Sequence, residues 1–380
     1  MKLSLIKYNS INAIQSEDWD RLNDEKNPFL QHRFLAALEN SGTVSSKTGW
    51  TVAHLGWLDD KGQLQAVIPQ YYKTHSYGEY MFDWDWAHAI TKAGMAYYPK
   101  AVASIPFTPV IGSRLMMSEQ CKAENIHRFD LVKQCLSSIK VQRFSNLQCL
   151  FLGVEESQDW QKAGAMIRKG YQFSWYNDNY QRFDDFLAKL RSSAKKKVRR
   201  ERRAVVELGI SFQCFENSEI TDQIWHFFIQ CYQQTYLKRS GHLGYLNHEF
   251  FHKLREIMSE QLLVVHASRG DEALAAALFI KGNNILYGRY WGTMQAIDGL
   301  HFECCYYQGI EYCINNGYHC LQPGTQGDYK RRRGFIPEHT YGAYYFTIPG
   351  LEQPIKGFLD QEADYLEKQF SEWQKTSPYK

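Results

Sequence analysis

The same succession of predicted elements occurs twice in the sequence, and this repeat constrains the fold more than any other feature. VAHL (52–55) and VVHA (264–267) each open a β-hairpin, and LQCLFLG (147–153) and YHCLQPG (318–324) each follow a helix as a buried strand. A chain of 380 residues has room for roughly two to three domains of average size. The repeat therefore predicts two α+β domains of one fold, at residues 1–180 and 181–380.

Several segments give clear local signals. Residues 262–281 predict a hairpin around the turn RGDE. Residues 157–170 begin with a capping serine and end on glycine, which predicts a helix, and 184–209 is helical in character up to Gly209. Residues 301–317 carry apolar side chains at i, i+3, i+4 and i+7, the stripe of an amphipathic helix. The aromatic, turn-rich stretch 74–113 shows no pattern that assigns it.

Basic residues are concentrated in two short segments. The formal net charge is only +3, yet residues 189–203 hold nine basic residues and one acidic residue. The run KRRR at 330–333 adds four consecutive cations, so the rest of the chain is mildly acidic. Focused charge predicts an anionic partner better than diffuse charge does. The alternative for the first segment is a solvated helix face.

Composition excludes several classes of protein. A hydrophobic fraction of 44% and a charged fraction of 22% exclude disorder and fibrous repeats as the main description. Apolar runs stay well short of the 18 residues that a membrane span needs, and no signal-peptide segment opens the sequence. The nine cysteines are odd in number and show no repeated spacing, so we expect reduced thiols and a cytoplasmic protein.

Two loops are candidate binding sites. Residues 289–294, RYWGTM, lie between a predicted strand and a helix, where backbone N–H groups can bind phosphate. Residues 323–335, PGTQGDYKRRRGF, follow a buried strand and join two glycines to four cations. Arginine binds phosphate or carboxylate through two hydrogen bonds, and such loops at strand ends usually border a cleft. The alternatives are a packed turn and a solubilising surface loop.

Acid–base and metal chemistry have weaker candidates. His301 and Glu303 lie on the polar face of the helix predicted at 301–317, and Asp328 precedes the cationic run. The segment DWDW (83–86) alternates two acidic residues with two tryptophans. This pattern suits the binding of a sugar or an amine, and the alternative is a packed loop. The histidines and cysteines between 301 and 320 spread around a helix, whereas zinc needs converging ligands. We therefore expect core cysteines and no metal. A serine nucleophile elbow, a P-loop and a dinucleotide fingerprint are absent.

At these residues the sequence resembles the FemAB-like "peptidoglycan biosynthesis/recognition" proteins of the GNAT-related acyltransferase superfamily, over residues of roughly 20–370. The resembling segments are HSYGEYMFDWDWA, YYPK, PFTPVIGSRL, KKKVRRER, GRYWG, LHFECCYYQGIEYCI and GTQGDYKRRRGFIPE. The resemblance implies two tandem GNAT-like domains, in agreement with the repeat.

The resemblance also implies roles for individual residues. A basic helix precedes the second domain's strands in Fem transferases, and residues 190–212 are similar to it. The F-K-x-x-F pattern of those enzymes matches Tyr329, Lys330 and Phe335, with four residues instead of two between the lysine and the phenylalanine. Of the GNAT pyrophosphate pattern, Arg289 and Gly292 are present, whereas Met294 stands where glycine or alanine is expected. The donor implied is acyl-CoA or aminoacyl-tRNA.

The predicted function is an N-acyltransferase that moves an acyl or aminoacyl group from an activated donor to an amine, with a cell-wall precursor as candidate acceptor. Possible partners are a small or nucleotide-linked anionic substrate and tRNA. The alternative is a non-catalytic protein that binds an anionic precursor or RNA. The candidate catalytic residues are Lys330, Glu303, His301 and Asp328. The candidate substrate-binding residues are Lys196, Arg199, Arg200, Arg203, Arg289, Trp291, Gly292, Gln322, Gln326, Arg331, Arg333, Asp83, Trp84 and Asp85.

Overall fold

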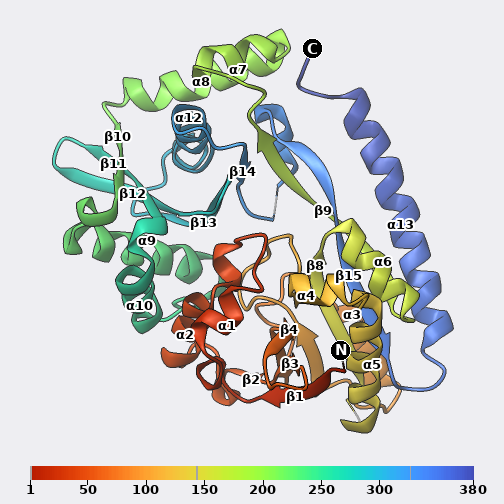
Figure 1. Ribbon diagram of the computed structural model, residues 1–380. Helices are drawn as coiled ribbons and strands as arrows, with labels where there is room; N and C mark the ends of the chain where they lie inside the picture. The colour runs from red at the N-terminus through yellow and green to blue at the C-terminus, as the bar shows by residue number, and fades with distance from the viewer. Residues whose placement is uncertain (1, 143, 326) are drawn as a thin grey trace. The chain divides into compact units, whose positions relative to one another are not determined.

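A computed structural model describes residues 2–142, 144–325 and 327–380 (Figure 1). The chain forms two compact units, one of residues up to Tyr171 with His339–Gln369, the other of Gln172–Glu338 with Phe370–Lys380. The boundaries fall within strands β9 (Met166–Tyr176) and β15 (Ile336–Phe346) and within helix α13 (Glu352–Lys375), so each of these elements contributes residues to both units. The sequence predicted a single domain boundary near residue 180. In the structure, residues 339–369 belong to the first unit.

The first unit begins with one small sheet and continues into a larger one. Strands β1, β3, β4 and β7 form the small sheet, and β9, β15, β8, β6, β5 and β2 follow one another in the larger. The bounds are β1 Ser4–Tyr8, α1 Ser16–Asp20, α2 His32–Asn40, β2 Trp50–Val52, β3 His54–Leu58, β4 Leu64–Ile68, β5 Gln70–Lys73, α3 Trp84–Lys92, β6 Lys100–Ala103, β7 Met116–Met117, α4 Glu119–Ala123, α5 Arg128–Gln142, β8 Asn146–Leu152, α6 Val154–Lys162 and α13 Glu352–Lys375.

Alternating side chains of β6 give the first unit two cores. Ala101 and Ala103 face a cluster that includes Leu131 and Ile139 of α5. Val102, between them, joins the opposite cluster with Trp86 of α3. This is the two-residue period of a strand that is buried on both faces.

In the second unit the strand order is β10, β11, β12, β13, β14 and β9. Helices α9 and α10 cover one face of this sheet and α12 covers the other (Figure 1). The bounds are α7 Phe183–Lys189, α8 Ser192–Glu207, β10 Ser211–Glu216, α9 Asp222–Ser240, α10 His248–Met258, β11 Leu262–Arg269, β12 Glu272–Lys281, β13 Ile285–Thr293, α11 Leu300–Phe302, the π-helix η6 Glu303–Tyr307, α12 Gln308–Asn315, β14 Cys320–Gln322 and the 3₁₀-helix η7 Asp328–Arg333.

The repeat seen in the sequence is present in the topology. In the second unit, β12 pairs antiparallel with β13, and β13 pairs parallel with β14 after a helical crossover. In the first unit, β5, β6 and β8 repeat this arrangement. The pairing of β13 with β14 ends at Tyr287 and Gln322, although β13 continues to Thr293. The predicted hairpin at 262–281 is confirmed as β11 and β12.

Two predicted helices were wrong in extent. The helix predicted at 157–170 ends at Lys162, because Gly164, with φ +106°, stops it and β9 begins at Met166. The helical stretch 184–209 is broken into α7 and α8 at Leu190, whose extended backbone pairs with Tyr379. The unassigned stretch 74–113 contains α3 and β6.

Candidate functional site

The run KRRR folds as part of η7, which separates its four cations into two pairs. Residues three apart share one side of a 3₁₀-helix, and accordingly Lys330 and Arg333 are both buried, each about 2% exposed. Arg331 and the exposed Arg332 instead line a pocket. The sequence suggested a single cationic loop. In the structure two of its four cations are buried and the other two border a pocket.

Lys330 is a buried amine with a single hydrogen-bond acceptor among the described residues. Its Nζ donates to the carbonyl oxygen of Gly324 at 2.5 Å. Burial lowers the pKa of Lys330 to about 7, and the nearby Cys305 thiol opposes this only weakly. A lysine with this pKa is close to half protonated at neutral pH, so its charge responds to any anion that approaches.

The π-helical turn η6 lies beside Lys330 and is bordered by aromatic rings. The wider π turn is uncommon and frequently marks functional sites. The ring centroid of Tyr306 lies 5.1 Å from that of Phe335. His301, just before the turn, has its ring centroid 5.0 Å from that of Trp291 on β13. Burial, and then the charge of Lys330, lower the pKa of His301 to about 4, so the imidazole is neutral at pH 7.

Helix α8 contacts this region through Glu201 and Arg202. The Arg333 guanidinium donates to both carboxylate oxygens of Glu201, at 2.7 and 2.9 Å, and lies 3.4 Å from the centre of the Phe302 ring. Arg202 pairs with Glu303 at 3.0 Å and with Glu311 at 2.7 Å. These cations are therefore neutralised by the protein itself.

Glu303 and Asp328, the two acidic candidates for a catalytic base, lie in opposite environments. Glu303 is 2% exposed, and its Oε2 has no hydrogen-bond partner among the residues that the structure describes. Burial raises the pKa of Glu303, although the Arg202 charge opposes the rise. Asp328 begins η7 and is exposed. Glu303 is consequently the better placed of the two to hold or release a proton.

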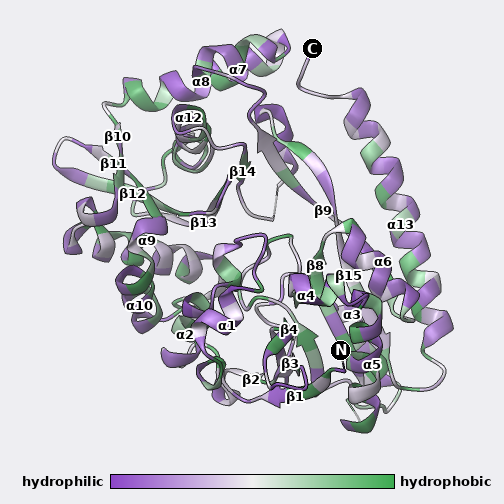
Figure 2. Ribbon diagram, in the orientation of Figure 1, coloured by the Kyte–Doolittle hydropathy of each residue, from purple (hydrophilic) through white to green (hydrophobic). Residues whose placement is uncertain are grey.

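The remaining cations border two hollows in the second unit. A pocket of about 580 Å³ is lined by Arg191, Lys197, Arg331, Arg332 and Lys375, with no carboxylate among its described lining residues. A depression of about 640 Å³ along α8 is lined by Lys195, Lys196, Arg199, Arg200 and Arg203, with Glu207 at its end. Hydrophilic residues cover most of α8, and hydrophobic ones appear toward β10 (Figure 2). Both hollows suit an anionic ligand.

The residues of the predicted pyrophosphate pattern have contacts within the protein. A Cβ atom on Gly292 would lie 1.8 Å from the carbonyl oxygen of Cys231 on α9, so the glycine permits close packing of α9 on β13. The carbonyl oxygen of Trp291 accepts a hydrogen bond from Thr235 at 2.9 Å. The Arg289 guanidinium lies 5.0 Å from the Tyr290 ring centre. Gln322, at the end of β14, is half-buried.

The two remaining sequence candidates, Gln326 and the DWDW segment, give different outcomes. Gln326 lies outside the described residues. In the first unit, Asp83 is buried and pairs with Lys100 at 2.5 Å, whereas Trp84 is 38% exposed and Asp85 is exposed. The alternation in DWDW thus separates its two acids, and a single ligand contacting both is not supported by this arrangement.

Sequence reasoning missed a buried charged cluster around Lys100 in the first unit. Its Nζ donates to Glu79 at 2.7 Å as well as to Asp83. Lys73 lies nearby, 3.4 Å from the centre of the Trp50 ring, and burial lowers its pKa to about 6. Burial raises the pKa of Glu79 to about 7. Lys100 lies 17 residues beyond Asp83, on a different element, so the fold brings it to the other charged groups.

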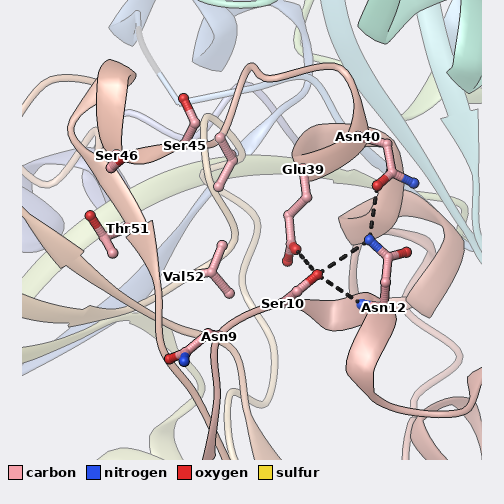
Figure 3. A pocket seen from close by; sticks show the side chains of 10 residues that line it. Asn9, Ser10, Asn12, Glu39, Asn40, Ser45, Ser46, Thr51 and Val52 are labelled. Atoms are coloured by element: carbon pink, nitrogen blue, oxygen red, sulfur yellow. Dashed lines mark hydrogen bonds between the residues drawn. The ribbon is translucent and has the colours of Figure 1, made fainter.

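The first unit contains a polar pocket of about 350 Å³, and its lining side chains form hydrogen bonds within the protein (Figure 3). Glu39, its only carboxylate among the described lining residues, accepts from Ser10 at 2.8 Å and from the backbone of Ile11 at 3.0 Å. Its other oxygen lies 3.0 Å from His54 Nε2. The pocket therefore adds no reactive group to the candidate site.

The fold and the basic site define a class of protein: an α+β protein of two tandem GNAT-like domains with a cationic second domain. Residues 10–380 match the FemAB-like family, described as peptidoglycan biosynthesis/recognition, and the chain belongs to that family. At the general level, this family is one of transferases of acyl or aminoacyl groups. Comparison with curated protein sequences gives no match.

Solved structures share the fold at low sequence identity. FemX is 12% identical, with 92% of this chain and 100% of that chain covered and a TM-score of 0.54. L-PGS from Bacillus licheniformis is 11% identical, with 88% and 96% covered and a TM-score of 0.53. The C-terminal domain of a putative lysylphosphatidylglycerol synthetase from Agrobacterium fabrum is 12% identical, with 91% and 96% covered and a TM-score of 0.53. Within the described residues, no helix is sufficiently long and apolar to cross a membrane.

Proposed function

We propose that the protein is an N-acyltransferase whose second unit binds a phosphate-bearing substrate and transfers an acyl or aminoacyl group to an amine of a cell-wall precursor. The observation that carries the proposal is Lys330. Its buried amine has a pKa of about 7 and belongs to the same helical turn as Arg331 and Arg332, which line a pocket without carboxylates among its described residues.

Lys330 can couple the arrival of negative charge to its own protonation. In the free protein, burial disfavours the ammonium form. An incoming phosphate or a developing oxyanion favours that form, so binding draws a proton onto Nζ. The positive charge then appears where it stabilises the transition state, in a site that excludes water.

The reaction forms one bond and breaks one. The acceptor amine nitrogen attacks the acyl carbonyl carbon, a C–N bond forms, and the carbonyl oxygen becomes an oxyanion. Collapse of this intermediate expels the donor's oxygen or sulfur, which takes up a proton, while the amine loses one. Lys330 supplies charge to the oxyanion or to a donor phosphate. Glu303, whose Oε2 is unpartnered among the described residues, is proposed to take the amine proton.

The contacts between α8 and the start of α11 favour aminoacyl-tRNA over acyl-CoA as the donor. Binding of pyrophosphate at the start of α11 needs space and free backbone N–H groups there. A Cβ on Gly299, the N-cap of α11, would lie only 3.4 Å from Val205 and 3.7 Å from the Glu201 carbonyl oxygen, so α8 lies against this corner. The cations of α8 meanwhile form a long basic face that suits a polyanion.

A non-catalytic binding protein is the second candidate, and one observation favours it. The pKa of His301 is lowered to about 4, which makes the imidazole a weak base at neutral pH, and Asp328 is exposed. Only Glu303 then stands out as a base, and Arg202 already holds it. A binder would keep the anionic ligand and lack turnover.

The test combines transfer with proton uptake. Purified protein is incubated with radiolabelled aminoacyl-tRNA or acyl-CoA and a nucleotide-linked sugar–peptide acceptor, and amide formation is measured. Binding of uncharged tRNA is measured by calorimetry in buffers of different ionisation enthalpy. We expect Lys330→Met to lower turnover by roughly 100–1000-fold and to abolish the proton uptake. Lys189→Met, which removes an exposed lysine outside both basic hollows, is the matched control and should change neither.

Each outcome separates the candidates. Turnover that depends on Lys330 supports the transferase. Tight, salt-dependent tRNA binding without turnover under any donor supports the binding protein. Turnover that is unchanged in Lys330→Met removes the role assigned to this residue.

A further inference from the structure

Three histidines of the second unit meet on the surface where α9 packs against α10. His226 lies in the first turns of α9, and His248 and His252 lie four residues apart on α10. Residues at i and i+4 share one face of a helix, so the two α10 rings point the same way. Helices α9 and α10 lie side by side below the sheet (Figure 1).

The aromatic core beneath the histidines fixes the two helices. The Trp225 ring, next to His226, lies 6.3 Å from that of Phe251, next to His252, and Phe228 lies 5.4 Å from Phe251. All three of these aromatic side chains are completely buried. The positions of the histidine backbones are therefore set by packing that does not depend on the histidines themselves.

The distances among the rings suit a shared metal ion. One ring nitrogen from each histidine can be chosen so that all three lie within 4.8 Å of one another. A tetrahedral zinc ion with bonds of about 2.0–2.1 Å places its nitrogens about 3.4 Å apart. Because all three side chains are exposed, small rotations about their side-chain bonds close the difference without movement of the backbone.

Charged residues of both helices surround the three histidines, and they form ion pairs within each helix or between the two helices. Asp222, one turn before His226, forms an ion pair with Arg255 at 2.6 Å, and the charges of these two residues largely cancel. Glu249 faces Lys253 at 3.0 Å, so the charges of that pair largely cancel.

We propose that His226, His248 and His252 form a site for a divalent transition-metal ion of the zinc class, which joins α9 to α10 and keeps a fourth position open to water. Imidazole ligands select such metals over magnesium or calcium. The expectation of no metal rested on the histidines and cysteines between 301 and 320. The new site lies outside that segment.

Occupancy of the site would stabilise the helix that supports β13. Further along α9, Thr235 donates to the carbonyl oxygen of Trp291, and Cys231 packs on Gly292. Because the metal ion would bind the folded helix pair and not the unfolded chain, it raises the stability of the second unit, and this gain grows with the logarithm of the metal concentration above the Kd. The inference does not rest on the proposed transferase activity.

Metal-free protein provides the test. We expect zinc to bind with a stoichiometry of one in isothermal titration calorimetry, cobalt to develop visible absorption of tetrahedral type, and zinc to raise the Tm by a few degrees. Binding should weaken as the pH falls, because protons compete with the metal ion for the imidazole nitrogens. His248→Ala and His252→Ala should each weaken zinc binding by at least tenfold, whereas His127→Ala, which removes another exposed histidine, should not.

The outcomes are distinct from those for the transferase. Substitution of exposed histidines leaves the aromatic core intact, and circular dichroism of each variant verifies this. Failure of zinc to bind at micromolar concentration overturns the proposal. So does binding of one zinc ion that survives substitution of all three histidines, because the ion would then occupy another site.

Discussion

Replacement of Arg333 by methionine separates the two roles that this residue can have. The sequence assigns Arg333 to substrate binding with the other cations of KRRR. In the structure its guanidinium is 2% exposed, forms two hydrogen bonds to Glu201 and lies against the Phe302 ring. Such a side chain is committed to the protein interior, and we expect Arg333→Met to act on stability.

The expected magnitude follows from these contacts. Removal of one partner from a buried ion pair typically costs about 3–5 kcal/mol, because the other charge remains buried and uncompensated. Glu201 keeps Lys197 at 3.6 Å and the hydroxyl of Tyr307 at 2.5 Å, and it is 13% exposed. We therefore place Arg333→Met near the lower limit, at about 3 kcal/mol in the free energy of unfolding. The double variant Arg333→Met, Glu201→Met leaves no unpaired charge and should lose less than the single variant.

Equilibrium unfolding in urea gives the free energy of unfolding of both variants. Titration with tRNA at constant salt gives their affinity for this ligand. The reasoning predicts a lower midpoint for Arg333→Met, partial recovery in the double variant, and unchanged affinity in the fraction that remains folded. Wild-type stability combined with a tenfold loss of tRNA affinity would refute it. Arg333 would then be a ligand-binding residue, as the sequence suggests.

Two further predictions concern packing and pH. Gly292→Ala should destabilise the second unit by about 3 kcal/mol, because the new methyl group would overlap the Cys231 carbonyl oxygen. Gly357→Ala in α13, which has open space around it, is the control and should be neutral or stabilising. Thermal unfolding of both variants measures the difference. Burial lowers the pKa of Lys73 to about 6, so between pH 6 and 10.5 the unfolded chain binds more protons at this residue and stability rises with pH. Lys73→Met should therefore be more stable than wild type at pH 7, with a difference that shrinks by up to about 1.4 kcal/mol per pH unit toward pH 9, while Lys61→Met should show no such trend.

The sequence predicted the fold well because its main signals are local. Hairpins and buried strands have short apolar patterns, and their repetition pointed to two domains of one kind. The extents of the helices were less accurate. Gly164 and Gly170 both resemble helix stops, and the first of them ends α6. The break at Leu190 depends on pairing with Tyr379, which is 189 residues away in sequence and thus invisible in any local window.

The candidate site was predicted only in outline. Composition and spacing located the two basic segments, whereas the burial of Lys330 and Arg333 depends on the fold. Sequence alone did not show that Arg333 and Arg202 are matched by carboxylates of distant segments. The spacing H-x-x-x-H at 248–252 was a readable signal for a metal site, but its third member comes from another helix.

The position of acidic residues decides which cations of the second unit remain available for a ligand. Glu201 is the single acid of the basic run, and it pairs with Arg333; Glu303 and Glu311 pair with Arg202. These pairs join α8 to the turns that carry the candidate catalytic groups, so part of the positive charge serves to hold the site together. The other cations line the two hollows on α8 and η7, where Lys197 also contacts Glu201 and Arg199 contacts Asp184. A basic segment is thereby divided into a buried, paired part and a part that borders the hollows, which explains how a chain with a net charge of only +3 can present a strongly cationic surface.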